Sequence, residues 1–143
     1  MSRRSPPSSR SSRDGLLRDE SGQSTVELAL ALPVLLIVLI GAVQFALVHH
    51  AENVANTATA EGARLAAGEG NSLLDGAVRT RSVLEAGLGP TGSAFAVTAE
   101  DRGETVVTQA SGEYRLFIPW VTSLAITIES SSEVRKEEFR SGP

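Results

Sequence analysis

Residues 28–48 read LALALPVLLIVLIGAVQFALV and contain no charged side chain. As a helix, these 21 residues would be roughly 31 Å long, which matches the hydrocarbon core of a bilayer. The only strongly polar side chain among them is Gln44, and Pro33 removes one backbone hydrogen bond and permits a kink. A buried helix of a soluble protein would normally show a polar face at this length. The sequence therefore predicts a transmembrane helix from Leu28 to Val48.

Charge is distributed unevenly around this helix. Residues 1–22 carry five Arg against three acidic residues, a balance of +2, so that the rest of the chain has a charge of −6 within a net charge of −4. Basic residues collect on the cytoplasmic side of membrane helices, and the next basic residue after the helix is Arg64. We therefore expect a single pass through the cytoplasmic (inner) membrane, with a cytoplasmic N-terminus and residues 49–143 outside.

The N-terminal leader, residues 1–22, differs in composition from everything that follows. Its first 21 residues are rich in Ser, Arg and Pro, with Leu16 and Leu17 as the only adjacent apolar pair. So few apolar residues cannot offset the entropy lost on ordering. The leader is therefore predicted to be disordered.

Composition argues against several classes of function. Aromatic residues make up only 4% of the chain and the body is acidic, which disfavours a nucleic-acid partner. There is no cysteine for a disulfide or a thiolate metal site. The two histidines, His49 and His50, are adjacent and would point about 100° apart on a helix, so they cannot form an i, i+4 metal pair. We expect no catalytic site, metal, cofactor or small-molecule substrate.

The region after the membrane helix is predicted to form a small α+β domain. The helix should continue to Gly68, because Ala, Glu and Leu are frequent and no Pro intervenes. Ser72 and Asp75 have the spacing of a capping box and predict the start of a second helix, which the Gly87–Pro90 segment should end.

Beyond Gly92 the apolar residues alternate, which indicates strands. A hairpin is expected with its turn at residues 101–103, followed by one long strand or by two strands interrupted at Ser111 and Gly112. A last strand is expected from Leu124, and the charged residues 131–143 are expected to fray. The prediction is thus an antiparallel sheet of three or four strands.

The segment directly before the apolar run is Gly22-Gln23-Ser24-Thr25-Val26-Glu27. Together with the run that follows, GQSTVELALALPVLLIVLIGAVQFA resembles the N-terminus of the TadE-like family of tight-adherence pilus proteins, which are relatives of type IV pilins. Two positions depart from the pattern: Leu28 stands where many relatives have an aromatic residue, and Gln23 where longer type IV pilins have a methylated aromatic one.

The resemblance implies a pilin-like fold and a structural role as a pseudopilin. It implies cleavage by a prepilin peptidase after Gly22, which would place Glu27 fifth in the mature chain. Glu27 would then pair with the new amine of Gln23, in its own or a neighbouring subunit. The partners implied are other pilin subunits through residues 23–48, the prepilin peptidase and membrane lipid.

Two other forms of the mature protein fit the same residues. An uncleaved single-pass anchor could present residues 49–143 as a binding or scaffolding domain of a secretion machine. Alternatively, Ala58-Thr59-Ala60 satisfies the small-x-small pattern of a signal peptidase, which would leave Glu61 as the first residue. The apolar run exceeds the usual length of a signal-peptide core, and Ala58 is ten residues beyond Val48.

Overall fold

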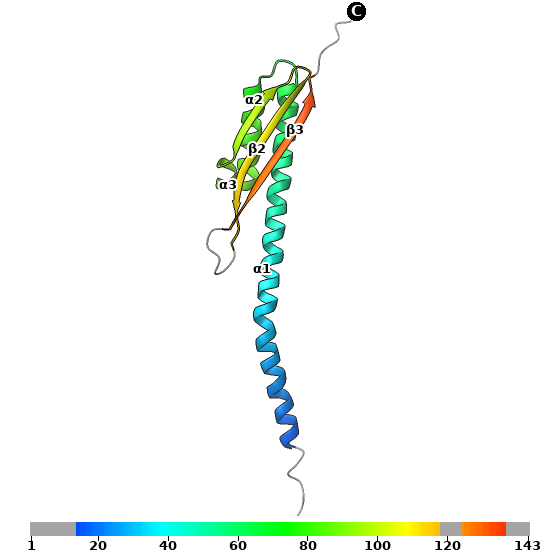
Figure 1. The fold of residues 1–143 in the computed structure, drawn as a ribbon, viewed down its shortest axis with the longest axis vertical. Coiled ribbons are helices and arrows are strands. Elements are labelled where there is room, and N and C mark those ends of the chain that lie inside the picture. Colours follow the sequence, from blue (N-terminus) through cyan, green and yellow to red (C-terminus); the bar gives the residue numbers. More distant parts are fainter. Residues whose placement is uncertain (1–13, 118–123, 137–143) are drawn as a thin grey trace, which may run out of the picture. The chain divides into compact units, whose positions relative to one another are not determined.

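The computed structural model describes residues 14–117 and 124–136, with side chains from residue 24 onward. Within these ranges the elements follow in the order α1 (Asp14–Ala67), α2 (Leu73–Leu88), α3 (Pro90–Ser93), β1 (Ala96–Asp101), β2 (Thr105–Arg115) and β3 (Ala125–Arg135) (Figure 1). Contacts divide the chain after Gly41 into two compact units. The first unit holds the N-terminal part of α1, and the second holds an α+β domain. The predicted fold class is confirmed, with three strands in the described sheet.

Helix α1 begins at Asp14, earlier than the composition indicates. Residues 14–21, predicted to be disordered, are helical instead, and residues 1–13 lie outside the described residues. The physical reason is cooperativity. Adding residues to an existing long helix requires no new nucleus, and residues 14–22 contain no proline that would stop the extension.

The C-terminal end of α1 agrees with the prediction. The helix passes Val48 without interruption and ends at Ala67. Gly68 follows, and its backbone N–H donates to the carbonyl of Leu65 at 3.2 Å. Gly70 then has φ 80°, a left-handed conformation that glycine adopts without steric cost.

Helix α2 starts at the predicted capping box. Ser72 is the N-cap, and its hydroxyl accepts a hydrogen bond from the Asp75 N–H at 3.2 Å. The Asp75 carboxylate in turn accepts from the Ser72 backbone N–H at 2.8 Å. Gly89, with φ 58°, ends the helix, as the Gly87–Pro90 segment predicted. The short helix α3, with Pro90 at its first turn, was not predicted.

The two helices of the domain form an antiparallel pair that is closest where both carry glycine. A Cβ atom added to Gly76 of α2 would lie 2.6 Å from the Ala66 Cβ and 2.7 Å from the Gly62 carbonyl oxygen of α1. Such distances are far below van der Waals contact, so the two backbones can approach this closely only without side chains there. Nearby, Arg79 of α2 pairs with Glu61 of α1 at 2.6 Å on the surface.

The sheet is antiparallel in the order β1-β2-β3. The predicted turn joins β1 to β2, with Gly103 at φ 86° and its N–H bonded to the Asp101 carboxylate at 2.8 Å. Strand β2 runs through Ser111 and Gly112 without interruption, so one long strand is present. A Cβ on Gly112 would lie 2.5 Å from the Phe95 ring, which shows that the glycine leaves room for this ring.

Strand β3 is longer than predicted and continues to Arg135. The expectation that residues 131–136 fray is wrong, whereas residues 137–143 lie outside the described residues. Val134 packs against the buried Val106 in the register of β2 with β3. Polar contacts add to this pairing: Glu133 accepts from Thr105 at 2.6 Å, and Lys136 pairs with Asp101 at 2.6 Å. Half-buried and exposed side chains therefore alternate along residues 131–135, although the sequence of this segment looks like a charged tail.

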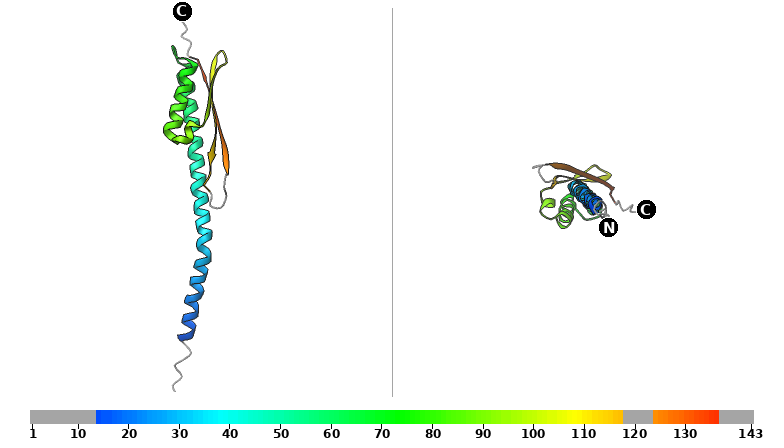
Figure 2. Two further views of the ribbon diagram at one scale, coloured as in Figure 1. Left: turned by 90° about the vertical axis from the view of Figure 1, so that its left-hand side faces the viewer. Right: turned by 90° about the horizontal axis from the view of Figure 1, so that it is seen from below.

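The core of the domain lies between the sheet and the helix pair, which form two layers (Figure 2). Its larger cluster consists of Ala51, Ala55, Ala58, Leu84, Phe95, Ala110 and Ile128. Residues of α1 contribute only alanines to this cluster. A face of small side chains lets both the sheet and α2 approach the α1 backbone closely.

A buried polar chain joins α1 to β3. Ser130 lies 2.8 Å from the Thr59 hydroxyl and 2.8 Å from the Asn56 amide oxygen. Ser130 donates to Asn56, and the Thr59 hydroxyl also lies 3.1 Å from the backbone carbonyl oxygens of Ala55 and Asn56, so each hydroxyl has a partner. Because unpaired buried hydroxyls are costly, this pairing favours one position of β3 along α1.

Gly76→Ala should destabilise the domain. The added methyl group must push α1 and α2 apart, and we expect a loss of about 1–3 kcal/mol, part of which the higher helix propensity of alanine offsets. Thermal unfolding followed by circular dichroism in detergent would measure it. Ser82→Ala on the exposed side of α2 is the matched control and should leave the midpoint unchanged or raise it. Equal midpoints for both variants would contradict the close approach.

The capping box should make stability depend on pH. Hydrogen bonds from the Ser72 side chain, and then from its backbone, lower the pKa of Asp75 below its ordinary value of 3.8. The ionised carboxylate therefore stabilises the folded state above that value, and this contribution is lost as the pH falls through the lower folded pKa. Asp75→Asn should lower the unfolding midpoint at pH 7, and the difference from the natural chain should shrink in acid. Glu85→Gln, on the same helix, is the control.

Candidate functional site

Among the described residues, α1 carries an extended exposed apolar surface. The segment Ser24–Ala67 is long and apolar enough to cross a membrane, and its most apolar part is not buried. Leu30 is 72% exposed and Phe45 is 74% exposed. Water solvates such a surface poorly, whereas lipid or other apolar helices can cover it. The N-terminal apolar helix therefore indicates a membrane anchor.

The predicted transmembrane helix, Leu28 to Val48, ends close to where α1 becomes buried in the domain. Leu28 is exposed, and Val48 lies three residues before Ala51, which is the first fully buried residue among the side chains of α1 that the structure describes. Pro33 lies inside the helix, which continues on both sides of it. The apolar run thus passes into the packed part of the domain within one turn.

Glu27 stands at the start of this apolar surface. It is exposed, and residues 28–31 after it are apolar. None of the ion pairs among the described side chains involves Glu27. Gly22 and Gln23 lie one turn earlier in the same helix. An ionised carboxylate that lipid or protein covers is costly unless a cation pairs with it.

The histidines lie just beyond the apolar run and hold no metal-like arrangement. The His49 ring stacks on Phe45, with 6.2 Å between ring centroids, and its Nδ1 is 3.4 Å from the Glu52 carboxylate. Among the described side chains no group of three or more His, Asp or Glu residues could hold a metal ion.

Gln44, the polar exception in the apolar run, has a partner that sequence reasoning missed. Its amide oxygen accepts the backbone N–H of Phe117 at 3.1 Å, across 73 residues of sequence. The sequence did single out Gln44, because it is a polar residue within an apolar run. Its partner is set by where β2 ends, which no local pattern indicates.

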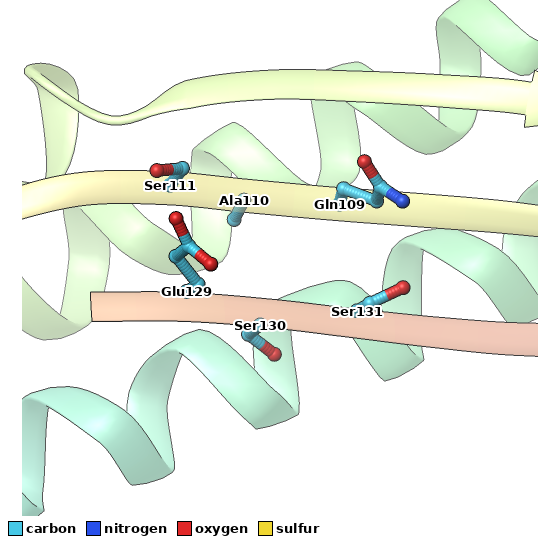
Figure 3. Close-up of a pocket in the computed structure, with 6 residues that line it drawn as sticks. All are labelled: Gln109, Ala110, Ser111, Glu129, Ser130 and Ser131. Atoms are coloured by element: carbon cyan, nitrogen blue, oxygen red, sulfur yellow. The ribbon is translucent and has the colours of Figure 1, made fainter. Parts of the chain in front are cut away.

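A shallow depression of about 330 Å³ lies on the sheet. Its lining alternates between β2 and β3 and consists of Gln109, Ala110, Ser111, Glu129, Ser130 and Ser131 (Figure 3). Glu129 is the only carboxylate of this lining, and no histidine or lysine accompanies the hydroxyl groups.

The apolar helix and its charged start coincide with a known family. Residues 22–64 match the family model described as "TadE-like protein". This segment of the chain is TadE-like. The match begins at Gly22 and includes Glu27, Pro33 and Val48, so that every residue predicted to matter for processing, assembly or membrane spanning lies within it.

The TadE-like segment ends at Arg64, inside α1, and leaves α2 and the sheet outside the match. No curated protein matches the chain. No solved structure matches it either. The family suggests a protein associated with the tight-adherence pilus.

Proposed function

We propose that this chain is a pseudopilin or minor pilin-like structural component of tight-adherence pilus assembly. The observation that carries the proposal is the TadE-like match, which starts at Gly22 and spans the whole apolar run. A prepilin peptidase cuts the chain after Gly22, at the cytoplasmic face, where the arginine-rich leader stays. The mature protein then begins at Gln23 and has Glu27 as its fifth residue.

Cleavage changes the electrostatics of the helix start. It removes five Arg and three acidic side chains and creates one α-amino group at Gln23. The Glu27 carboxylate is the natural counter-charge, because no described cation pairs with it. When apolar helices pack together, the amine of one subunit and the carboxylate of its neighbour neutralise each other. The pairing allows α1 to move from lipid into a helix bundle.

The protein's role in this proposal is structural. The apolar surface of α1 supplies the contacts with other pilin subunits, and the α+β domain lies outside the cytoplasm.

The packing of α1 argues against processing by signal peptidase. Cleavage after Ala60 would remove Ala51, Ala55 and Ala58, each fully buried in the core. It would also remove Thr59, which bonds to Ser130. An uncleaved anchor stays the second candidate, since the same domain packing is available to a chain that keeps its leader.

Gly22→Ala should abolish processing. N-terminal sequencing of the natural protein, expressed with its prepilin peptidase, should find Gln23 first, and the variant should keep residues 1–22. Gly41→Ala is the matched control, because it is also a glycine of α1 and an added Cβ there meets nothing within 4 Å. An intact natural terminus would identify a plain anchor, and a start at Glu61 would identify signal-peptidase export.

Glu27→Gln should be processed normally but should assemble poorly. The amine of Gln23 would then lack its counter-charge, at a cost of about 2.5–3.5 kcal/mol in an apolar bundle, or about 100-fold weaker association. Co-purification of two differently tagged copies from membranes would report this loss. Glu69→Gln, an exposed carboxylate beyond α1, should associate like the natural protein. Unimpaired association of the Glu27 variant would disprove the charge pairing.

A further inference from the structure

The end of the sheet nearest Gln44 exposes large apolar side chains. Phe117 is 75% exposed and Leu124 is 45% exposed, although both belong to the folded domain. The N–H of Leu116 donates to the Leu124 carbonyl at 2.9 Å, which holds the two chain segments together. We refer to Leu116, Phe117 and Leu124 as the sheet end.

The sheet end is fixed at a definite height on α1. Phe117 is hydrogen-bonded to Gln44, which precedes Val48 by four residues. At the rise of an α-helix, Gln44 lies about 6 Å inside the apolar run. Wherever lipid surrounds the helix up to Val48, the sheet end must therefore be at the depth of the headgroup and acyl-chain boundary. Large apolar residues would be poorly placed in water at this position.

We propose that the sheet end inserts into the interface of the same bilayer that α1 spans. The proposal rests on α1 as a membrane anchor and not on a role in a pilus. The partner is the lipid surface, which accepts aromatic and aliphatic side chains to a depth of about 5–10 Å.

Polar groups at the sheet end are arranged as a lipid environment requires. Backbone N–H groups near hydrocarbon need an internal acceptor, and the Gln44 amide supplies one for Phe117. The same bond gives a partner to the one strongly polar side chain of the apolar run. The sheet end itself has no charge, and the preceding Arg115 is exposed and long enough to reach lipid phosphates.

Single-tryptophan variants of the full-length protein would test this insertion. The chain has one tryptophan, Trp120, so Trp120→Phe gives the background. Phe117→Trp reports on the sheet end, and Leu124→Trp gives a second reporter there. Leu36→Trp reports on the middle of α1. Leu74→Trp, at a 70% exposed apolar position of α2, is the control in the same domain. Each protein is reconstituted in phosphatidylcholine vesicles brominated near the carboxyl end or near the methyl end of the acyl chains.

We expect both sheet-end reporters to lose emission and shift to the blue, most strongly with bromine near the carboxyl end. The α1 reporter should be quenched most by bromine near the methyl end, and the α2 reporter should keep its emission. If Leu36→Trp is quenched but both sheet-end reporters behave like Leu74→Trp, the insertion is disproved while the anchor stands. If Leu36→Trp is not quenched either, the anchor is disproved and the insertion with it. Circular dichroism of each variant establishes that the domain is folded.

Discussion

The domain depends on how closely its other elements can approach the α1 backbone. From Ala51 onward the buried face of α1 carries alanine, glycine and threonine, and the larger core side chains come from α2, the segment before β1, and the sheet. At Gly62 and Gly76 the helices are so close that neither position has room for a Cβ. A helix with such a face contributes little apolar area of its own. It is stabilised in the domain because its small side chains let Leu84, Phe95 and Ile128 pack close to its backbone.

The difference between large and small side chains explains how one helix can contact both lipid or neighbouring helices and the core of its own domain. Before Ala51 the apolar side chains are large and exposed, which suits lipid or neighbouring helices that fill irregular space. From Ala51 onward the side chains of α1 that are buried are small, which suits a fixed intramolecular contact. The change happens within about one turn, at the histidines. The size of the apolar side chains along α1 therefore differs between the part that lipid or other helices can cover and the part that packs within the domain.

Local signals sufficed for much of the fold. The capping box at Ser72, the glycines that end α1 and α2, and the turn before Gly103 each depend on residues within one or two turns of each other, so the sequence pattern contains them. The apolar run and its Gly22–Glu27 start predicted the family, because that family is recognised by a contiguous segment. Long-range pairing was less visible. Residues 131–135 look like a charged tail until β2 is placed beside them, and Gln44 has no visible partner until the end of β2 is known.

The hydroxyl chain between Thr59, Ser130 and Asn56 has a consequence for how this domain can change in length. Side chains of a strand alternate between its two faces. One residue inserted before Ser130 would therefore turn the Ser130 hydroxyl away from α1, and a residue from the opposite face of β3 would lie beside Thr59. Slipping β3 by two residues keeps the correct face but brings Ile128 or Ser132 to that position, and isoleucine could not donate to the Asn56 amide oxygen as Ser130 does. We therefore expect insertions and deletions only in the connections between strands. Within the strands, residues can be substituted, but the alternation of buried and exposed positions must be kept.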